Sequence, residues 1–299
     1  MITAKSLTKK FDSKIALDNI NLTIPDGCVY GLVGSNGSGK STLLRLISGV
    51  YMTDGGTIQV DDKNCFNNPV IKSQIAFLGD TPYFLPQSNL KEMATLYSSM
   101  YPEFDYETYK HLLTVFPLNP KARLSTFSKG MQRQAALILA LSTNPKYLLM
   151  DEAFDGLDVV MRRVLANIVM DGVQQRGMTA IIASHNLREL ENVCDSVCVI
   201  HEGKIISNGN IESLRGNMHK VQVAFSEVPE MSVFDSLYVM KTERTGSLLS
   251  LVVRGEEDEI MQFINSLNPL YAECIEPTLE EVFVYELEVC GYDVKNILS

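Results

Sequence analysis

Apolar and β-branched runs separated by turn residues occupy the first 80 positions of the chain. The runs LTKKF, IALDNINLTI, VYGLVG and TIQV are broken by the pairs DG, GG and DD, which are typical of turns. VYGLVG (29–34) leads straight into a glycine-rich stretch, and KSTLLRLISGV follows with helical spacing. The pattern therefore predicts a strand-rich region with a buried strand, a tight loop and a helix.

The pattern becomes helical over residues 85–127. KEMATLYSSMY follows candidate caps at Ser88 and Asn89, and YETYKHLLTVF follows Pro102. We expect a helical subdomain here, distinct from the sheet.

Helical segments and short apolar runs alternate from Ser128 onward. The order is SKGMQRQAALILALS, KYLLMDEAF, MRRVLANIVMDGVQQR and TAIIASH, continued by LRELENVC, SVCVIHEG and KIISNG. Buried strands between amphipathic helices indicate an α/β fold with a parallel sheet.

The last 84 residues differ in both pattern and charge. They offer three strand candidates (VQVAF, LYVMKT and LLSLVVR), the acid-first helix EEDEIMQFINSLN and the closing segment EPTLEEVFVYELE. They also hold 15 acidic and five basic residues, so the whole net charge of −10 lies in them. We expect a first domain over 1–215, a boundary near Gly216, and an acidic α+β subdomain over 216–299.

Composition narrows the class of protein. Hydrophobic residues make up 45% of the chain, as in soluble globular proteins. No run approaches the ~18 apolar residues of a membrane-spanning helix, and MITAKSLTKKF lacks the apolar core of a signal peptide. A nucleic-acid backbone favours clusters of Lys and Arg, whereas the excess charge of this chain is acidic and the sequence shows no basic cluster beyond the pair Lys9-Lys10; this argues against a nucleic-acid partner. We therefore expect a cytosolic protein, in which the six cysteines (Cys28, Cys65, Cys194, Cys198, Cys274 and Cys290) are reduced and buried.

Residues 34–42, GSNGSGKST, match the phosphate-binding pattern G-x-x-x-x-G-K-[ST] between a predicted strand and a predicted helix. Glycines let the backbone turn so that its N–H groups point at phosphate oxygens, and the helix N-terminus adds partial positive charge. We expect Lys40 to reach the β- and γ-phosphates and Ser41 to bind Mg²⁺. The alternative is a turn that merely caps a helix. The predicted ATP-binding residues of this loop are Gly34, Ser35, Asn36, Gly37, Ser38, Gly39, Lys40, Ser41 and Thr42.

Two further strand ends carry candidate catalytic groups. KYLLMDEAF ends in Asp151 and Glu152, and TAIIASH ends in His185. Ligands collect at the carboxyl edge of an open α/β sheet, so we expect Asp151 to hold the Mg²⁺ shell, Glu152 to polarise the attacking water and His185 to hydrogen-bond the γ-phosphate. The alternatives are a strand-end acid satisfied by backbone N–H groups and a histidine buried in the core.

The order of these motifs resembles the nucleotide-binding subunit of ATP-binding cassette (ABC) transporters, over about residues 1–215. GSNGSGKST, MDE and the histidine after TAIIAS match the family closely, and FSKGM (127–131) matches the signature segment LSGGQ at Ser128 and Gly130. The resemblance implies a P-loop NTPase of the ABC type, with a mixed sheet core and a helical subdomain.

The family resemblance also implies that two such domains pack head to tail. The signature residues Ser128, Lys129, Gly130 and Met131 would then contact the ATP of the partner subunit, and the loop Asp155, Gly156, Leu157 and Asp158 would follow the catalytic acid. Lys129, which LSGGQ lacks, would contact phosphate or ribose or be solvated. Phe11 would stack on adenine with Ile15 beside it, the alternative for Phe11 being the core.

The sequence departs from the family at several places. Asp80 stands where the family carries a glutamine that binds Mg²⁺; we expect Asp80 to do this work, with Gln87 as an alternative. TPYFLP (81–86) would contact a membrane partner or fold inward. EPTLEEVFVYEL (276–287) resembles the closing segment of ABC-2-type exporter ATPases, and the tail would support dimer contacts, regulate activity or simply add core.

The resemblance therefore implies an ATPase that uses ATP and Mg²⁺ and drives transport, with export favoured, through a separate integral membrane permease. A second ATPase subunit, identical or a paralogue, would complete it, and the complex would hold this chain at the cytoplasmic face of the cell membrane. The alternatives are a soluble ABC ATPase acting on ribosomes or DNA, and a module that binds ATP without hydrolysing it.

Overall fold

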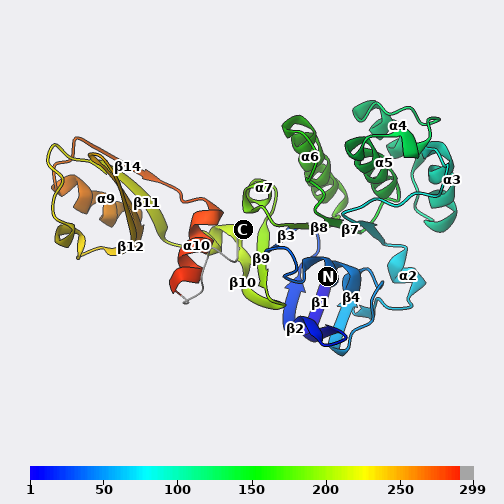
Figure 1. The fold of residues 1–299 in the computed structure, drawn as a ribbon, viewed down its shortest axis with the longest axis horizontal. Helices are drawn as coiled ribbons and strands as arrows, with labels where there is room; N and C mark the ends of the chain where they lie inside the picture. Colours follow the sequence, from blue (N-terminus) through cyan, green and yellow to red (C-terminus); the bar gives the residue numbers. More distant parts are fainter. Residues whose placement is uncertain (290–299) are drawn as a thin grey trace. The chain divides into compact units, whose positions relative to one another are not determined.

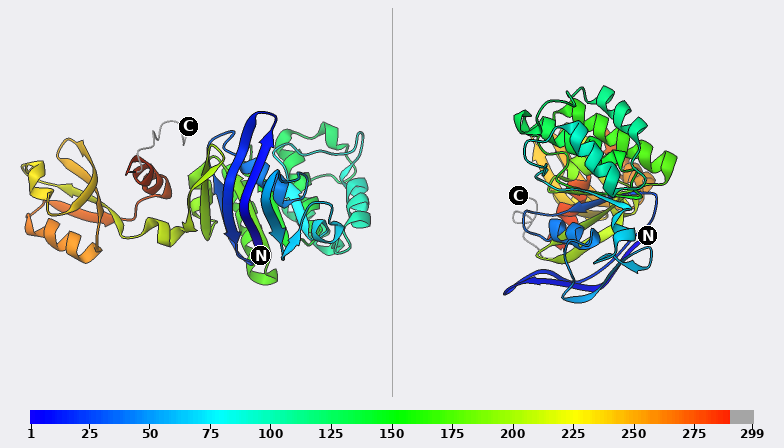
Figure 2. Two further views of the ribbon diagram at one scale, coloured as in Figure 1. Left: turned by 90° about the horizontal axis from the view of Figure 1, so that it is seen from below. Right: turned by 90° about the vertical axis from the view of Figure 1, so that its right-hand side faces the viewer.

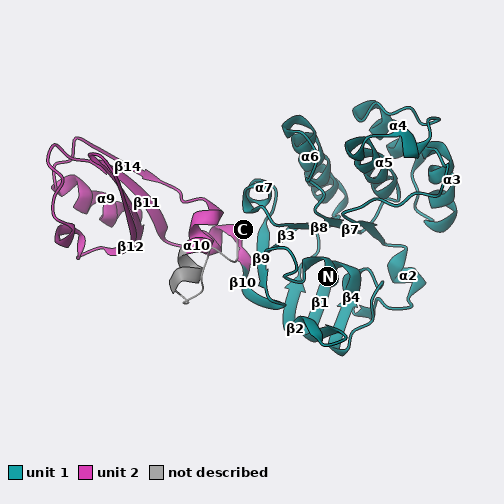
Figure 3. Ribbon diagram, viewed as in Figure 1, with its two compact units in different colours: residues 1–208, 298–299 teal, residues 209–297 magenta. Residues whose placement is uncertain are grey.

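The computed structural model describes residues 1–289 and divides the chain into two compact units (Figure 3). Unit 1 covers Met1–Asn208, and unit 2 begins at Gly209. The sequence placed this boundary near Gly216, where the charge changes. The structure places it a few residues earlier, because the short helix α8 (Ile211–Arg215) packs against α10 (Leu279–Val289) inside unit 2.

Unit 1 contains a four-stranded antiparallel sheet of order β2-β1-β4-β5 (Figure 2). The strands are β1 (Ile2–Phe11), β2 (Lys14–Ile24), β4 (Gly55–Val60) and β5 (Lys63–Asn64). β1 pairs with both β2 and β4. Its buried side chains, which include Ile2, Ala4 and Leu7, join the main core of the unit.

The second sheet of unit 1 has six strands in the order β10-β9-β3-β8-β7-β6 (Figure 1). The strands are β3 (Val29–Val33), β6 (Ile75–Leu78), β7 (Tyr147–Asp151), β8 (Thr179–Ser184), β9 (Ser196–His201) and β10 (Lys204–Asn210). The pairs β3–β8, β3–β9, β7–β8 and β6–β7 are parallel, as predicted from the alternation of helices and apolar runs. Every residue of β3, β7 and β8 is buried.

Helix α1 (Lys40–Ile47) lies between the two sheets, because it contacts β2 and β4 of one sheet and β7 of the other. Its buried leucines at 43, 44 and 46 share a core with Leu32 of β3 and Leu149 of β7. The glycine-rich loop that precedes α1 is thus fixed between two layers of packed structure.

A group of helices follows β6 along the chain, as the sequence predicted (Figure 1). Asn89 and Glu92 form a capping box at the start of α3, and Asp105 caps α4. Helix α5 begins after its cap Ser128 and packs against both α3 and α4. The bounds are α3 (Leu90–Met100), α4 (Tyr106–Val115), η1 (Leu124–Thr126) and α5 (Lys129–Ser142).

The remaining helices of unit 1 are α2 (Pro69–Lys72), α6 (Val159–Arg176) and α7 (Leu187–Glu191). α6 and α7 both contact β8. Within the described residues, none of the helices combines the length and apolarity needed to cross a bilayer.

Unit 2 is built on a four-stranded antiparallel sheet of order β12-β13-β11-β14. The bounds are β11 (Met218–Ala224), η2 (Met231–Phe234), β12 (Tyr238–Thr245), β13 (Leu248–Arg254), α9 (Glu257–Ser266) and β14 (Tyr271–Ile275). The sequence predicted three of these strands and missed β14. Helix α9 packs on one face through Ile260 and Ile264, and Val282 of α10 packs beside Met218 and Val252.

The cysteines of the described residues are free thiols. Cys65, Cys194 and Cys198 are buried, as predicted, whereas Cys28 and Cys274 are half-buried. Cys290 lies outside the described residues.

Candidate active site

Three neighbouring parallel strands bring the candidate motifs to one edge of the six-stranded sheet. β8 lies between β3 and β7, so the carboxyl ends of all three strands are adjacent. The glycine-rich loop follows β3, Asp151 ends β7, and His185 follows β8. This is the edge at which open α/β sheets bind ligands.

The glycine-rich loop needs glycine where the chain turns most sharply. Gly37 and Gly39 have φ of 80° and 118°, in a region that L side chains rarely adopt. At Gly34, a β-carbon would lie 2.1 Å from the carbonyl oxygen of Ile200. The backbone of the loop therefore turns tightly, as the backbone of a phosphate-binding loop does.

Lys40 is the buried cation of this loop. It is 5% exposed, and its Nζ donates hydrogen bonds to the carbonyl oxygens of Gly34 (2.6 Å) and Ser35 (3.2 Å). Oε1 of Glu152 lies 3.6 Å from the same Nζ. Burial lowers the pKa of Lys40 from its ordinary value, and the carboxylates of Glu152 and Asp151 oppose that shift.

Asp151 and Ser41 form an oxygen-rich pair beside Lys40. The Oγ of Ser41 donates a hydrogen bond of 2.9 Å to Oδ1 of Asp151. Asp151 is 1% exposed, and its Oδ2 has no hydrogen-bond partner among the described residues. Burial raises the pKa of Asp151, although the Ser41 hydroxyl opposes this. A buried carboxylate oxygen without a partner, next to a hydroxyl, fits a hard divalent cation such as Mg²⁺.

Glu152 and His185 face each other across the ends of β7 and β8. Oε2 of Glu152 and Nδ1 of His185 are 2.9 Å apart. Glu152 has φ of 51°, the left-handed region that costs about 1–2 kcal/mol for such a residue. Strain of this kind clusters at functional sites.

The carboxylate of Asp155 lies near both side chains, since the three ligand atoms are within 4.8 Å of one another. The sequence placed Asp155 in the following loop but did not predict this contact.

The signature segment lies at the start of helix α5. The Oγ of Ser128 accepts a hydrogen bond of 3.2 Å from the N–H of Met131, so Ser128 is the N-cap. Lys129 and Met131 are exposed. A β-carbon on Gly130 would lie 3.6 Å from the carbonyl oxygen of Gly156, so the two predicted loops are neighbours within the chain.

The loop after Glu152 ends at helix α6. Asp158 caps α6 by accepting a hydrogen bond of 2.9 Å from the N–H of Met161, and Leu157 is buried. The sequence missed a residue here: Arg162 donates to the carbonyl of Leu157 (3.0 Å) and pairs with Glu189 (2.6 Å). Glu189 in turn accepts a hydrogen bond from Ser184, at the end of β8.

Asp80 is paired with Arg133 of helix α5, which the sequence did not predict. Nη2 of Arg133 lies 3.0 Å from Oδ1 of Asp80 and also donates to the Asp80 carbonyl at 2.9 Å. The two residues line a cavity of about 370 Å³ together with Lys129, Gly130 and Gly156. Asp80 thus faces the signature helix in this structure, and it would have to release Arg133 to bind a metal.

Phe11 and Ile15 lie at the turn between β1 and β2. They are 40% and 46% exposed, so Phe11 is not a core residue. The Phe11 ring meets the Tyr51 ring edge-on at 5.3 Å, and Nζ of Lys9 lies 5.2 Å from its centre. The Phe11 ring is thus an accessible aromatic surface on which the adenine ring of a nucleotide could stack.

Comparisons with known proteins agree with this architecture. Residues 17–155 match the sequence model of the ABC transporter family. The ABC transporter ATP-binding protein YtrB of Bacillus subtilis (strain 168) is 27% identical over 95% of this chain and 97% of its own length. The lantibiotic transport ATP-binding protein SrtF of Streptococcus pyogenes is 30% identical over 73% of this chain and 96% of its own.

A solved structure supports the fold independently. A dimeric ATP-binding cassette in a post-hydrolysis state, bound to ADP and phosphate, superposes with a TM-score of 0.65 at 20% identity. It covers 71% of this chain and 99% of that one. The part of the chain that precedes unit 2 thus has the fold of an ABC ATPase, and the chain belongs to the family of ABC transporter ATP-binding proteins.

Proposed function

We propose that this chain is the ATP-hydrolysing subunit of an exporter and that it drives a separate membrane permease. The observation that carries the proposal is the convergence of Lys40, Ser41, Asp151, Glu152 and His185 at one sheet edge. A phosphate-binding loop, an oxygen pair for a cation and a positioned carboxylate are the groups that phosphoryl transfer to water requires.

The loop 34–42 holds the phosphates of ATP. Its backbone N–H groups and the positive end of α1 bind phosphate oxygens, and Lys40 exchanges its two carbonyl contacts for the β- and γ-phosphates. The adenine ring stacks on Phe11 beside Ile15, both of which are accessible.

Ser41 and Asp151 are the residues that would hold Mg²⁺, and the bound ion would add positive charge at the phosphate oxygens. The unpartnered Oδ2 of Asp151 supports this assignment.

Glu152 is the general base. Its carboxylate accepts a proton from water as the water oxygen bonds to the γ-phosphorus, the bond from that phosphorus to the bridging oxygen breaks, and ADP and phosphate leave. His185 holds Oε2 of Glu152 in place, and its imidazole would also contact the γ-phosphate. Asp155 lies beside both residues, so motion of its loop would reach the base directly.

A second ATPase subunit completes each site. Ser128 and Gly130 lie at the exposed N-terminus of α5, where a hydroxyl, backbone N–H groups and the helix dipole can meet the γ-phosphate held by the partner. The similar dimeric cassette bound to ADP and phosphate supports this arrangement.

The permease docks on the segment 81–86. Tyr83 is 77% exposed and Leu85 is 47% exposed, so this short segment offers two neighbouring apolar side chains that a partner can cover. The segment directly follows Asp80, whose contact with Arg133 links it to the signature helix. Through this contact the chain would be held at the cytoplasmic face of the membrane.

Export is the direction that the tail favours. The segment EPTLEEVFVYEL resembles the closing segment of ABC-2-type exporter ATPases, and the relative YtrB spans almost the whole chain, tail included.

Phosphate release from ATP by the purified chain, alone and with a co-purified membrane protein, tests the proposal. We expect Mg²⁺-dependent release that Lys40→Ala abolishes together with ATP binding. ATP binding without phosphate release in either preparation would overturn the proposal in favour of a binding module. Release without any co-purifying membrane protein would instead favour a soluble ATPase.

A further inference from the structure

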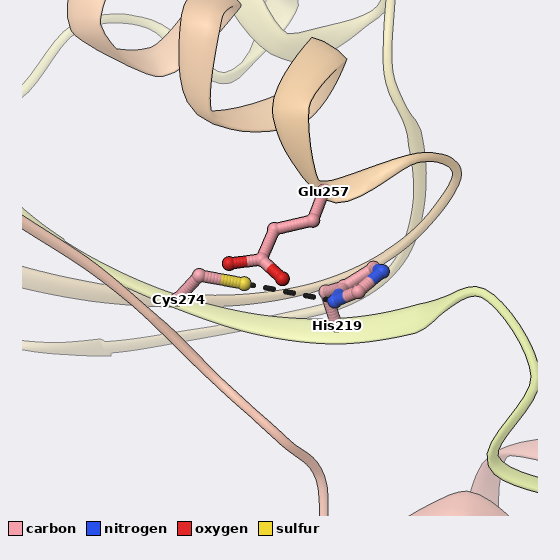
Figure 4. A group of neighbouring side chains, drawn as sticks. All are labelled: His219, Glu257 and Cys274. Atoms are coloured by element: carbon pink, nitrogen blue, oxygen red, sulfur yellow. Dashed lines mark hydrogen bonds between the residues drawn. The ribbon is translucent and has the colours of Figure 1, made fainter. Parts of the chain in front are cut away.

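Unit 2 holds a cluster of three metal-ligating side chains that takes no part in the proposed ATP site. His219 lies on β11, Glu257 is the first residue of α9, and Cys274 lies on β14 (Figure 4). Their ligand atoms are all within 4.8 Å of one another. In Figure 4 the imidazole, carboxylate and thiol point toward a common centre.

The register of the sheet explains why His219 and Cys274 meet. β11 and β14 are antiparallel, and Val221 lies directly opposite Cys274. His219 is two residues from Val221, so it emerges on the same face and is the diagonal neighbour of Cys274. The contact is therefore a consequence of strand pairing and does not depend on a loop.

Helix α9 supplies the third group. Ile260 and Ile264 of α9 are buried against Val221 and Val223 of β11. Glu257 lies one helical turn before Ile260, so the packing that anchors α9 also fixes the Glu257 carboxylate over this end of the sheet.

The spacing of the donor atoms matches that of a metal site. Sγ of Cys274 lies 3.6 Å from Nδ1 of His219. A tetrahedral zinc ion, with Zn–S near 2.3 Å and Zn–N near 2.0–2.1 Å, requires sulfur and nitrogen to be about 3.6 Å apart. The competing explanation is a metal-free network, in which the Cys274 thiol is hydrogen-bonded to the Glu257 carboxylate and lies 3.6 Å from Nδ1 of His219.

We propose that His219 Nδ1, the Glu257 carboxylate and Cys274 Sγ bind one transition-metal ion of the Zn²⁺ class. Sulfur and imidazole ligands favour such ions over Mg²⁺ and Ca²⁺, which prefer oxygen. Three protein ligands leave a fourth position, and the exposure of Glu257 lets water fill it. Because the ligands come from two strands and a helix, the ion joins β11, β14 and α9, and its binding energy stabilises unit 2. This proposal is independent of the proposed ATPase function.

Titration of the chelator-treated full chain with Co²⁺ provides the test. A sulfur-to-cobalt charge-transfer band appears only when a thiolate binds the metal, so a metal held by oxygen ligands at the ATP site is silent. We expect one Co²⁺ per chain with this band, displaced by one equivalent of Zn²⁺. Its absence from the wild-type chain would overturn the proposal and leave the metal-free network as the explanation.

Matched variants assign the ligands. Cys274→Ser should abolish the band, and His219→Gln and Glu257→Gln should each weaken binding at least about 100-fold, because loss of even an outer-shell partner costs 10–100-fold. Cys28→Ser, also at a half-buried thiol, and Glu259→Gln, in the same turn of α9, should bind as the wild type does. A band that persists in Cys274→Ser, or that disappears equally in Cys28→Ser, contradicts the assignment. Circular dichroism of each variant shows whether unit 2 still folds. If Cys274→Ser does not fold, the proposal is tested by the presence of the band in the wild-type chain and by the weaker Co²⁺ binding of the surface variant Glu257→Gln.

Discussion

Oε2 of Glu152 lies 2.9 Å from Nδ1 of His185, although the two residues follow different strands and are 33 positions apart. The contact exists because β7 and β8 are parallel neighbours whose carboxyl ends meet. The other oxygen of Glu152 lies 3.6 Å from Lys40. The carboxylate is therefore held from two sides, as a proton acceptor that must not move should be.

Replacing Glu152 with Gln tests this role of the carboxylate. Gln keeps the size and the hydrogen-bonding ability of the side chain but accepts a proton far less readily. We expect phosphate release to fall about 10²–10⁴-fold, while the affinity for ATP changes little. Asp171→Asn, at an exposed acid on α6, is the control and should hydrolyse ATP normally. Unchanged turnover in Glu152→Gln would mean that another residue is the general base.

Variants of Asp80 and Arg133 distinguish two roles for Asp80, which are binding Mg²⁺ and holding Arg133 of helix α5. If Asp80 leaves Arg133 to bind Mg²⁺, Asp80→Ala raises the Mg²⁺ concentration for half-maximal turnover several-fold, since one oxygen ligand is lost. Arg133→Gln keeps the Asp80 carboxylate and should not raise that concentration. A Mg²⁺ response of Asp80→Ala identical to the wild type would mean that Asp80 serves the contact with α5 alone.

Asp61 links the two sheets of unit 1, and its contribution to the free energy of unfolding should depend on pH. Its carboxylate accepts hydrogen bonds of 2.7 Å from both Lys146 Nζ and the Tyr147 hydroxyl, at the start of β7. Burial alone would raise the pKa of Asp61, but these hydrogen bonds, together with a third from the Met1 amine (3.0 Å) and its positive charge, outweigh burial and hold the pKa below its ordinary value.

A carboxylate with a lowered pKa stabilises the fold above its unfolded pKa of about 3.9, and the stabilisation is lost as the pH falls below that value. Asp61→Asn should therefore lower the free energy of unfolding by about 1–2 kcal/mol at pH 7, as expected for hydrogen bonds to a partly exposed charge. Urea unfolding of both proteins should show the difference shrinking steadily below pH 4. Asp62→Asn, at the exposed neighbouring position, should have little effect at either pH. A difference that persists unchanged at pH 3 would mean that the charge of Asp61 is not its cause.

The arrangement of the candidate site could be predicted because it depends on strand ends. Asp151, Glu152 and His185 stand at or directly after the ends of apolar runs, and Lys40 follows the glycine-rich loop after another such run. Parallel strands place their carboxyl ends at one edge of the sheet. The same reasoning could not find the contact of Asp80 with Arg133. These residues are 53 positions apart, and a loop of no regular pattern carries one of them.

The tail was harder to predict for a physical reason. β14 is an edge strand of five residues with two half-buried and three exposed side chains, so its alternation is too short to stand out. Because β14 was missed, Cys274 could not be placed beside His219. The boundary at Gly209 depends on the packing of α8 against α10. The change of charge near Gly216 carries no information about that packing.

The central claim is that two chains share each ATP, and the molar mass of Glu152→Gln in solution tests it most directly. With slow hydrolysis, Mg²⁺ and ATP should convert this variant from monomer to dimer by light scattering, and ADP should not. Adding Ser128→Arg should keep it monomeric while ATP still binds, because the bulky cation blocks the signature face; Ser125→Arg, three residues earlier on η1, should still dimerise. Should Glu152→Gln with ATP stay monomeric at high concentration, and also in the presence of its co-purified partners, the shared site would be contradicted.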